Sequence, residues 1–561
     1  MNGGAIMVKR GESMDNICSI SNDGVRYEDY ALREGVRLCD IVKEKKFTGA
    51  ICAIMNGSVV SLAEMPYPGA RIQFLSPVKS EQASRVFLRG AAFLLYCAAK
   101  ALYPERLLIV DHALSGGVFC ELGEVTPEVV KALNRKIAEY IAAGGEFTLD
   151  MLHVEEARQA LLDEGLTDKV ELLEYRPFDY YRLYSFDGHR NYFNGVMPPG
   201  PGYMKGMSLH VYADGIMMRF PSPYAPARMA ITEQPKYAQM FAEAENWARI
   251  LGASYVYEIN AMYREGNISD FISVNEALHE KTIADIAQRI ADTKTARIVL
   301  IAGPSSSGKT TFAHRLSVHL RVLGKKCHPI SVDDYYKNRC DIPIDPDGKP
   351  DFECVEALDI EKLGQDLKVL LSGGTAELPL FDFIQGARKP KGVPLSISSE
   401  DILVIEGLHG LNDALTSSIA RDVKFKIYIA PLATLNIDNH NVVMPEDVRL
   451  LRRLVRDQRT RGYDFSQTFA AWDSVRRGEF KYILPYQESA DVMFNSMLIY
   501  EPLILKKYCY SELLRFTPEM PGYPEAQSLL KFLNYFLSVE DENAIPVNSL
   551  LREFIGPIVA R

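Results

Sequence analysis

The clearest pattern of apolar and polar positions in this chain begins at residue 298. Residues 298–302 read Ile-Val-Leu-Ile-Ala, and a short apolar run rich in β-branched residues predicts a buried parallel strand. After a loop of small residues, apolar side chains recur at helical spacing: Phe312, Ala313, Leu316, Leu320 and Leu323. Gly324 then predicts the end of that helix. The chain is therefore expected to form strand, loop and helix in succession.

Similar patterns flank this segment. Residues 402–405, Ile-Leu-Val-Ile, predict a second buried strand. Apolar positions within residues 232–294 recur at helical spacing, so we expect helices that connect to a domain further along the chain. Residues 35–77 alternate short β-rich runs with turns such as Asn56-Gly57, which is typical of a small β-grasp module.

Composition narrows the class of protein. At 561 residues the chain is expected to hold about three to five domains, and 47% hydrophobic with 24% charged residues fits a soluble globular protein. The net charge of −10 argues against a nucleic-acid coat or a polybasic membrane binder, although it allows a local basic groove. We expect no transmembrane helix and no signal peptide. Nine irregularly spaced cysteines without a C-x-x-C pair favour a reduced, cytoplasmic chain.

The loop between the strand and the helix carries a phosphate-binding pattern. Residues 303–311 read GPSSSGKTT and match G-x-x-x-x-G-K-[ST]. The two glycines let successive backbone N–H groups point at one anion, the lysine adds a cation, and the next hydroxyl can hold Mg²⁺. The expected phosphate contacts come from Gly303, Ser305, Ser306, Ser307, Gly308, Lys309, Thr310 and Thr311.

The loop alone does not name a reaction. A chance Gly/Ser turn is the alternative, and the order of strand, loop and helix argues against it. GTPases, ATPases and small-molecule kinases all share such a loop. The rest of the site must therefore identify the chemistry.

Carboxylates follow two predicted strands. The stretch from His328 to Val332 ends in Asp333-Asp334, where a carboxylate can accept a proton from an attacking hydroxyl. Residues 402–405 end in Glu406, the Walker-B arrangement that holds Mg²⁺ or its water. The alternatives are a solvated acidic turn for the first and a purely structural carboxylate for the second.

Six arginines fall within residues 449–461. Four of them are spaced three to four apart and could share one helix face: Arg449, Arg452, Arg453 and Arg456. In an acidic protein this favours an anionic ligand. A salt-bridged solvated helix and an RNA-binding helix are the alternatives, and the lack of interleaved aromatic residues weakens base stacking by the latter.

Five segments together resemble the uridine kinase/phosphoribulokinase family. GPSSSGKTT, SVDDYY, PLFDFIQGARKP, VIEG and RRLVRDQRTRGYDF follow one another in the family's order, across about residues 296–520. The resemblance implies an α/β P-loop kinase with a parallel sheet flanked by helices. It also implies ATP and Mg²⁺ as cofactors and transfer of a phosphoryl group to a ribose 5′-hydroxyl.

The resemblance assigns tasks to individual residues. It makes Asp333 the catalytic base, Lys309 a phosphate ligand, and Thr310 with Glu406 the Mg²⁺ ligands. It makes three arginines a lid that closes over the phosphates and excludes water: Arg449, Arg453 and Arg456. The acceptor contacts it implies are Tyr336, Glu353, Phe381, Phe383 and Arg388.

The acceptor segment departs from the family pattern. Uridine–cytidine kinases read like Y-D-F-x-x-H-x-R here, whereas this chain has Phe381 for the Tyr and Gly386 for the His. The family's ribose-binding Asp is Glu353. A site that lacks hydrogen-bonding groups cannot discriminate by them. Uridine or cytidine is the default acceptor by family, and another nucleoside or a sugar phosphate is the second candidate. A nucleotide-sensing or RNA-associated protein with little turnover is the alternative from another class.

The first half resembles parts of threonyl-tRNA synthetase. Residues 35–77 resemble a TGS domain, and the amphipathic helix expected at 84–104 resembles the start of the second additional domain. That domain's metal-binding His-x-x-x-His falls here on Arg89 and Phe93, so we expect no zinc or editing site. The later Cys-x-x-x-His falls on Ser185 and His189.

The expected division of the chain combines these resemblances. It comprises a TGS-like β-grasp module (1–78), an α+β domain like the synthetase editing domain (79–231), a helical connector (232–295) and the P-loop kinase domain (296–561). The first half could support the kinase or bind RNA or a small ligand. The expected partners are a small nucleoside or sugar acceptor, with RNA left open and no membrane, for a monomer or homo-oligomer.

Overall fold

The computed structural model describes residues 16–114, 116–176, 178–224, 233–345, 348, 350–382 and 385–557. Within these residues the chain forms two compact units. The first contains residues 16–170, 178–224 and 516–528, and the second contains residues 171–176, 233–515 and 529–557. Neither unit is continuous in sequence. No helix in the described part of the chain is long and apolar enough to cross a membrane.

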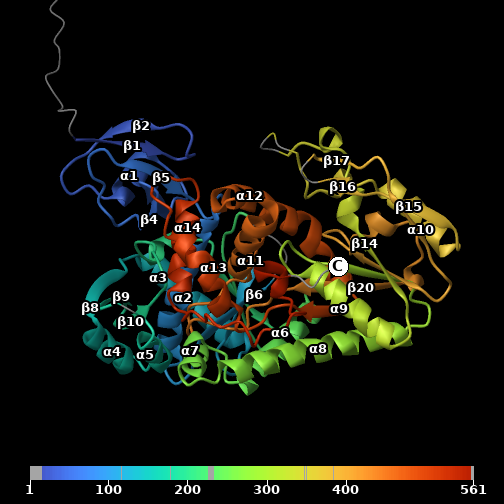
Figure 1. Ribbon diagram of the computed structural model, residues 1–561. Coiled ribbons are helices and arrows are strands. Elements are labelled where there is room, and N and C mark those ends of the chain that lie inside the picture. The colour runs from blue at the N-terminus through green and yellow to red at the C-terminus, as the bar shows by residue number, and fades with distance from the viewer. Residues whose placement is uncertain are drawn as a thin grey trace, which may run out of the picture. The chain divides into compact units, whose positions relative to one another are not determined.

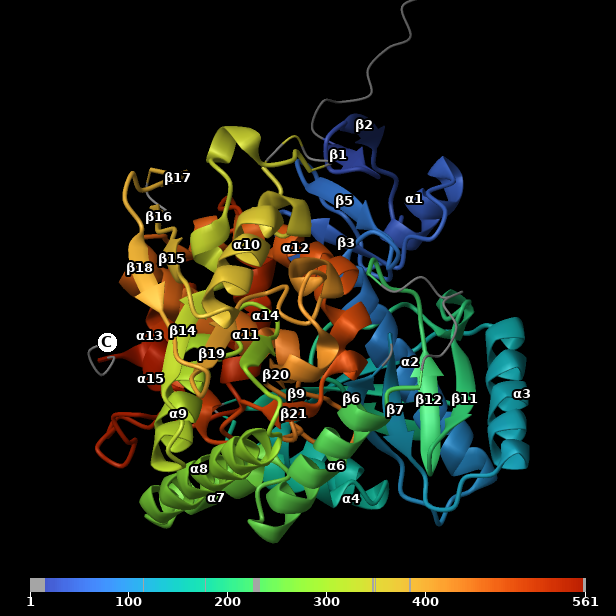
Figure 2. The same ribbon diagram turned by 90° about the vertical axis from the view of Figure 1, so that its right-hand side faces the viewer.

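The first unit begins with a five-stranded mixed sheet and one helix (Figure 2). The strand order is β2-β1-β5-β3-β4, with β1 parallel to β5 and the other neighbours antiparallel. Helix α1 packs Leu38 and Ile41 into the core of this sheet. The turn predicted at Asn56-Gly57 joins β3 to β4 and has positive φ at both residues. The bounds are β1 Ile17–Ser21, β2 Glu28–Ala31, α1 Leu38–Lys45, β3 Cys52–Met55, β4 Ser58–Ser61 and β5 Arg71–Leu75.

The rest of the first unit combines two antiparallel sheets with helices. The helix predicted at 84–104 is confirmed as α2, Glu81–Leu102. The sheets have the orders β10-β9-β8 and β11-β12-β7-β6. Their strands are β6 Ile109–Leu114, β7 Gly117–Glu121, β8 Thr148–His153, β9 Tyr180–Phe186, β10 His189–Tyr192, β11 Ser208–Tyr212 and β12 Gly215–Arg219. The further helices are α3 Pro127–Ala143, α4 Val154–Asp163, α5 Thr167–Leu173 and the 3₁₀ turn Pro201–Tyr203.

The positions that correspond to the synthetase metal ligands pack or bond within the first unit. Phe93 is fully buried against the rings of Phe147 and Phe193. The Arg89 guanidinium donates to the Val196 carbonyl at 2.9 Å. A phenyl ring and a guanidinium offer no lone pair to Zn²⁺, so these two positions contribute no zinc ligand. The TGS-like and synthetase-like identities remain predictions.

The second unit is built on a five-stranded, wholly parallel sheet in the order β14-β19-β13-β20-β21. The predicted strands 298–302 and 402–405 are confirmed as β13, Ile298–Ala302, and β19, Ile402–Glu406. The others are β14 Cys327–Ser331, β20 Lys424–Ala430 and β21 Val492–Asn495. All five residues of β13 are buried, because helices cover both faces of the sheet.

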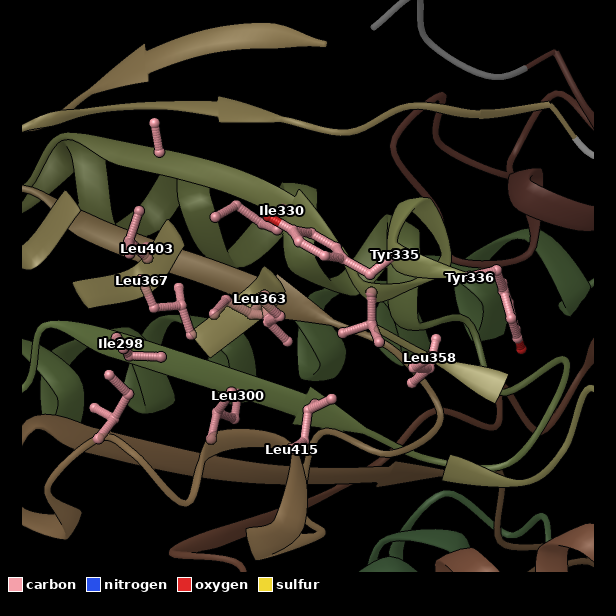
Figure 3. Close-up of a cluster of buried hydrophobic side chains, with 14 of the residues drawn as sticks. Ile298, Leu300, Ile330, Tyr335, Tyr336, Leu358, Leu363, Leu367, Leu403 and Leu415 are labelled. Carbon is pink, nitrogen blue, oxygen red and sulfur yellow. The ribbon is translucent and has the colours of Figure 1, made fainter. Parts of the chain in front are cut away.

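Alternation along the strands sends side chains to two separate cores. On one face, Ile298 and Leu300 pack with the α10 residues Leu363 and Leu367 (Figure 3). On the other face, Val299 and Ile301 pack against helices α8 (Ile268–Asp292) and α9 (Lys309–Val322) (Figure 1). The predicted helix after the loop is confirmed as α9, Lys309–Val322, and α10 spans Ile360–Leu371.

The predicted helical connector, residues 232–295, has a different place from the one expected. The described part is helical, with α6 Pro235–Ile250, α7 Val256–Arg264 and α8 Ile268–Asp292. Helix α8, however, buries Ile283, Ile286 and Ile290 in the core of the parallel sheet. These helices therefore belong to the second unit rather than linking two domains. Residues 516–528, expected within the kinase domain, belong to the first unit.

The second unit completes its fold with short strand pairs and a helical C-terminal part. The pairs are β15 Thr375–Leu378 with β18 Val393–Ser396, and β16 Phe381–Asp382 with β17 Ala387–Arg388. The helices are α11 Pro445–Arg456, α12 Phe465–Gly478, α13 Glu501–Leu513 and the short α15 Arg552–Ile555. Helix α14, Tyr523–Leu533, has residues 523–528 in the first unit and residues 529–533 in the second. π-Helical turns span Asp457–Arg461 and Glu479–Ile483. The 3₁₀ turns are Val332–Tyr335, Arg339–Asp341, Val355–Ala357, Asp413–Thr416, Arg421–Val423 and Leu484–Ser489.

Candidate active site

The glycine and serine loop follows β13 at the carboxyl edge of the sheet. Gly303 is required by space, because a Cβ there would lie 1.9 Å from the Ile429 carbonyl oxygen. Ser306 and Gly308 both adopt positive φ, of 61° and 86°. Positive φ is uncommon for serine, and such alternation is typical of backbone loops that hold anions. The local backbone therefore has the form that a phosphate loop needs.

Lys309 folds back onto this loop. Its Nζ donates to the carbonyl oxygens of Gly303 and Pro304 at 3.0 and 3.1 Å. Burial lowers the pKa of Lys309, while the nearby charges of Glu406 and Asp333 oppose that shift. The ammonium is thus held beside two carboxylates at the ends of neighbouring strands.

Glu406 ends β19 beside the first turn of α9. The Thr310 hydroxyl donates to its Oε1 at 3.3 Å, and the Ser331 hydroxyl donates to the same atom at 3.5 Å. Burial raises the pKa of Glu406 to about 7, and the charge of Asp333 adds to the shift. A buried carboxylate beside a hydroxyl is an oxygen pair suited to Mg²⁺, and a cation there would offset the cost of ionising Glu406.

Asp333 lies in the 3₁₀ turn after β14. Burial raises its pKa, and the charge of Lys309 acts against the shift. Arg456 and Arg461 also lie within electrostatic reach of this carboxyl. Asp333, Lys309 and Glu406 therefore form one charge cluster, although they come from three separate segments of the chain. Arg461 was outside the predicted site residues.

The arginine helix α11 packs against the phosphate loop. The solvated salt-bridged helix is the wrong alternative, because Arg449, Arg452 and Arg453 are at most 8% exposed. Arg453 Nη1 donates to the Ser305 hydroxyl at 2.9 Å, and burial lowers its pKa to about 10. Arg456 pairs with Asp457 at 2.8 Å. Arg453 thus contacts the loop directly, and the charge of Arg456 acts on Lys309.

Arg449 occupies a different place from the predicted lid contact. Its Nε donates to the Ser305 carbonyl at 3.0 Å, and its Nη1 pairs with Glu479 at 2.5 Å. Glu479 in turn pairs with Arg476 at 2.8 Å. Arg449 therefore connects the phosphate loop to the ion pair of Glu479 and Arg476. The role of Arg449 in a lid over the phosphates stays a prediction.

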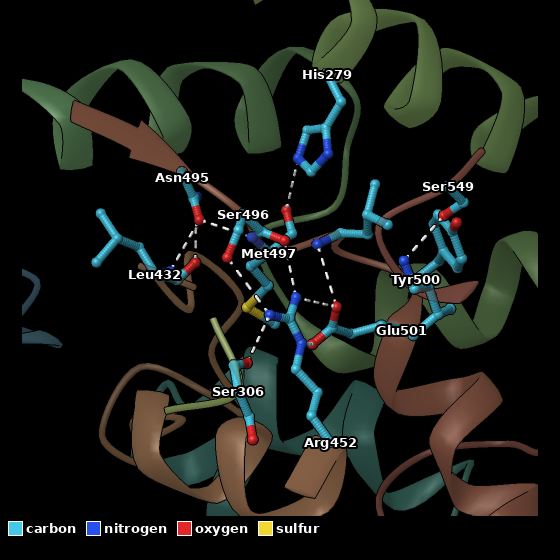
Figure 4. Close-up of polar contacts among 12 residues, drawn as sticks. His279, Ser306, Leu432, Arg452, Asn495, Ser496, Met497, Tyr500, Glu501 and Ser549 are labelled. Atoms are coloured by element: carbon cyan, nitrogen blue, oxygen red, sulfur yellow. Dashed lines mark hydrogen bonds and ion pairs between the residues drawn. The ribbon is translucent and has the colours of Figure 1, made fainter. Parts of the chain in front are cut away.

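Arg452 makes the most extensive contacts of the helix and was not among the predicted site residues (Figure 4). Its side chain is fully buried and holds both carboxylate oxygens of Glu501, at 2.9 and 2.7 Å. Its Nη1 donates to the Ser306 carbonyl at 3.2 Å and its Nη2 to the Ser496 carbonyl at 2.8 Å. Arg452 therefore links the loop residue with positive φ to the end of β21.

The predicted acceptor residues divide into two groups. Tyr336 and Phe381 are both buried, with ring centroids 5.8 Å apart, and the Tyr336 hydroxyl donates to the Phe352 carbonyl at 2.8 Å. Arg388 pairs with Asp359 at 2.9 Å and donates to the carbonyls of residues 335 and 336. Arg388 thus braces the backbone here. Phe383 lies outside the described residues.

Glu353 lies near the charge cluster. Burial raises its pKa to about 7, while Arg453 lowers it and Asp333 adds to the rise. A Cβ at Gly478 would come within 2.4 Å of the Glu353 Cβ, so α12 closely confines this side chain. Glu353 is consequently a half-buried carboxyl held beside Asp333 and Arg453.

His409 is a polar residue that the sequence did not single out. It follows Glu406 by three positions and is 2% exposed, with its ring 6.0 Å from that of Tyr482. Burial lowers its pKa to about 4, so the ring is neutral near pH 7, although the Glu353 backbone opposes the shift. A neutral imidazole offers one donor and one acceptor to a ligand.

The family match with known proteins lies within the second unit. Residues 298–500 match the phosphoribulokinase/uridine kinase family. The uridine kinase of Klebsiella pneumoniae subsp. pneumoniae is 28% identical over 199 residues, which is 35% of this chain and 85% of that protein. The uridine kinase of Macrococcus caseolyticus is 31% identical over 198 residues, 35% of this chain and 86% of that protein.

A solved structure of a possible uridine kinase from Bacillus stearothermophilus is 20% identical, with a TM-score of 0.26. It covers 38% of this chain and 98% of that one. The family match spans the phosphate loop, the two carboxylate-bearing strand ends and the arginine helix. The chain therefore belongs to the phosphoribulokinase/uridine kinase family.

Proposed function

We propose that this protein is an ATP- and Mg²⁺-dependent kinase that transfers a phosphoryl group to a hydroxyl of a small ribose-containing acceptor. The observation that carries the proposal is the joint placement of Asp333, Lys309 and Glu406 around the phosphate loop. Uridine or cytidine is the first acceptor to consider, because the relatives are uridine kinases.

The loop residues supply the nucleotide site. Backbone N–H groups of residues 303–311 and the Lys309 ammonium bind the phosphates, and Arg453 with Arg456 neutralises charge on the transferred group. Thr310 and Glu406 would hold Mg²⁺, which supplies charge neutralisation on the phosphate oxygens when it is bound. The contact between Thr310 and Glu406 at 3.3 Å supports this assignment.

Asp333 acts as the general base. Its carboxylate accepts the proton of the acceptor hydroxyl as that oxygen bonds to the γ-phosphorus, and the bond from phosphorus to the β–γ bridging oxygen breaks. A raised pKa makes Asp333 a stronger base than an ordinary aspartate once it is ionised. The charges of Lys309 and Arg456 favour that ionised form.

The acceptor side carries few groups that could identify a base. Phe381 and Gly386 stand where uridine–cytidine kinases have polar residues. Glu353 and His409 offer hydrogen bonds suited to sugar hydroxyls. This composition supports a second candidate, a kinase for another nucleoside or a sugar phosphate.

We also make a proposal about the domains of the first unit. We infer a TGS-like β-grasp module followed by a synthetase-like domain, and the β2-β1-β5-β3-β4 order with α1 packed on the sheet supports the first. The Arg89 and Phe93 positions support a domain without editing chemistry.

The test is acceptor-dependent ADP release from Mg²⁺·ATP, measured against nucleosides and sugar phosphates with an acceptor-free control. We expect a rise with one acceptor class and identification of its phosphorylated product by mass spectrometry. Binding of ATP without a rise for any acceptor would count against the kinase and favour a nucleotide-sensing protein.

The proposed contact of Glu353 predicts a pH dependence. With a pKa near 7 instead of its ordinary 4.5, this carboxyl is mostly protonated at pH 6 and ionised at pH 8. Only the ionised form accepts hydroxyl hydrogen bonds through both oxygens. We therefore expect the KM for the acceptor to fall by up to about tenfold from pH 6 to 8. The same shift lowers the stability of the acceptor-free protein as pH rises from 4.5 to about 7.

The Glu353→Gln variant separates this effect from the titration of Asp333. The amide cannot ionise, so the KM for the acceptor should become independent of pH, while kcat keeps the pH profile set by Asp333. An unchanged pH dependence of KM in Glu353→Gln would show that Glu353 does not contact the acceptor. Steady-state kinetics from pH 6 to 8 give both values.

A further inference from the structure

The last described segment of the chain forms part of the phosphate loop's surroundings. Ser549, Leu550, Leu551 and Phe554 are fully buried in the second unit. Leu550 belongs to the same core as β13 and α9, and a Cβ at Gly308 would lie 2.9 Å from its Cδ2. The segment therefore packs directly under the loop at the start of α9.

Polar contacts fix this segment from several sides. Arg459 Nη1 donates to the Phe554 carbonyl at 2.6 Å, and the Arg452 guanidinium lies 5.0 Å from the centre of the Phe554 ring. Arg552 pairs with Glu542 at 3.0 Å and donates to the Gly556 carbonyl at 3.0 Å. The position of α15 is thus set by buried and charged contacts on both sides of Glu553.

Glu553 points its carboxylate at the nucleotide site. Its Oε2 accepts a hydrogen bond from the Thr311 N–H at 3.1 Å. Thr311 is the third residue of α9, and the N–H groups of a helix's first turn have no partner within the helix. The negative charge of Glu553 also reaches Lys309 and helps raise the pKa of Glu406. A carboxylate of the chain itself therefore sits where a phosphate oxygen is expected.

We propose that Glu553 sets the affinity of the phosphate loop for its ligand, by occupying the Thr311 N–H in the nucleotide-free protein and opposing the arrival of an anion. This inference rests on the proposed function, because it assumes that the loop binds nucleotide phosphates. The carboxylate satisfies the helix end when the site is empty. It also repels phosphate, and bound Mg²⁺ offsets that repulsion, so Glu553 favours the Mg²⁺ complex of a nucleotide over the free nucleotide.

The test is ADP binding to the full chain by calorimetry, with EDTA and separately with Mg²⁺. Glu553→Gln keeps the size of the side chain and removes its charge. We expect its dissociation constant for metal-free ADP to fall by about tenfold, and that for Mg²⁺·ADP to fall by less. Glu540→Gln is the matched control, because it removes a charge from an exposed glutamate nearby in sequence whose side chain contacts Ser538. Its affinities should equal those of the wild type.

The outcomes separate this inference from the proposed function. Unchanged or weaker ADP binding by Glu553→Gln, with normal binding by the wild type, overturns the inference but does not contradict the proposed kinase function. Absence of ADP binding by the wild type overturns both. Glu553→Asp provides a second variant if the Gln variant folds poorly. Its shorter side chain keeps the charge but withdraws it from Thr311, so metal-free ADP should bind about two- to threefold more tightly, and weaker or equal binding contradicts the inference.

Discussion

Replacing Asp333 with asparagine is expected to lower kcat for phosphoryl transfer by about 10²- to 10⁴-fold. The amide keeps the shape of the side chain but cannot accept the proton of the attacking hydroxyl. Nucleotide affinity should change little, because the Gly303 to Thr311 loop and Lys309 remain in place. Single-turnover transfer and ADP calorimetry on the same preparation measure the two quantities separately.

Asp422→Asn is a suitable control for the Asp333 variant. Asp422 is exposed and lies two residues before β20, at the amino end of the strand, whereas the site lies at the carboxyl ends. Its kcat should match that of the wild type. Full transfer activity in Asp333→Asn would mean that another group accepts the proton. Loss of ADP binding in that variant would mean that Asp333 organises the loop instead.

Replacing Arg452 with methionine is expected to destabilise the second unit by about 3–5 kcal/mol. The change leaves Glu501 buried without its bidentate partner and leaves the carbonyls of Ser306 and Ser496 without this donor. Burial already raises the pKa of Glu501, and Arg452 is the charge that opposes this. The thermal midpoint of the unit should fall on the order of 10 °C.

Tryptophan fluorescence measures this transition selectively. The chain has two tryptophans, Trp247 and Trp472, and both lie in the second unit. The double variant Arg452→Met with Glu501→Leu removes both charges and should recover much of the thermal midpoint. It should not recover nucleotide affinity, because the bond to the Ser306 carbonyl is still missing. Full recovery of both would show that Arg452 does not position the loop.

Local pattern was sufficient for much of the second unit. The strand at 298–302, the helix after it and the strand at 402–405 were predictable, because each is a continuous apolar run or a helical repeat. The proximity of Thr310 and Glu406 was also predictable, since parallel strands place their carboxyl ends at one edge of a sheet. These inferences need only short stretches of sequence.

Local sequence patterns could not predict contacts between residues that are far apart in the chain. Arg452 and Glu501 are 49 positions apart, and Glu553 lies 242 positions from Thr311. The arginine repeat predicted the face of α11 but not which arginines would pair with carboxylates, such as Arg449 with Glu479. The sequence did not single out His409, because a single histidine after a strand becomes informative only when its burial and its neighbours are known.

Residues 516–528 belong to the first unit although they follow most of the second unit in sequence, and this affects when each unit can fold during synthesis. The Pro518 backbone lies against Gly57, and Gln82 donates to Glu525 at 3.4 Å. During synthesis from the N-terminus, the main part of the first unit is therefore made before its last segment. More than 280 further residues must be added before residues 516–528 can pack onto it. In the second unit, β13 and β21 are synthesised before Leu550, which packs in the same core. The two halves must consequently finish folding late and almost together, and a ribosome-released fragment ending near residue 510 should leave both of them incomplete.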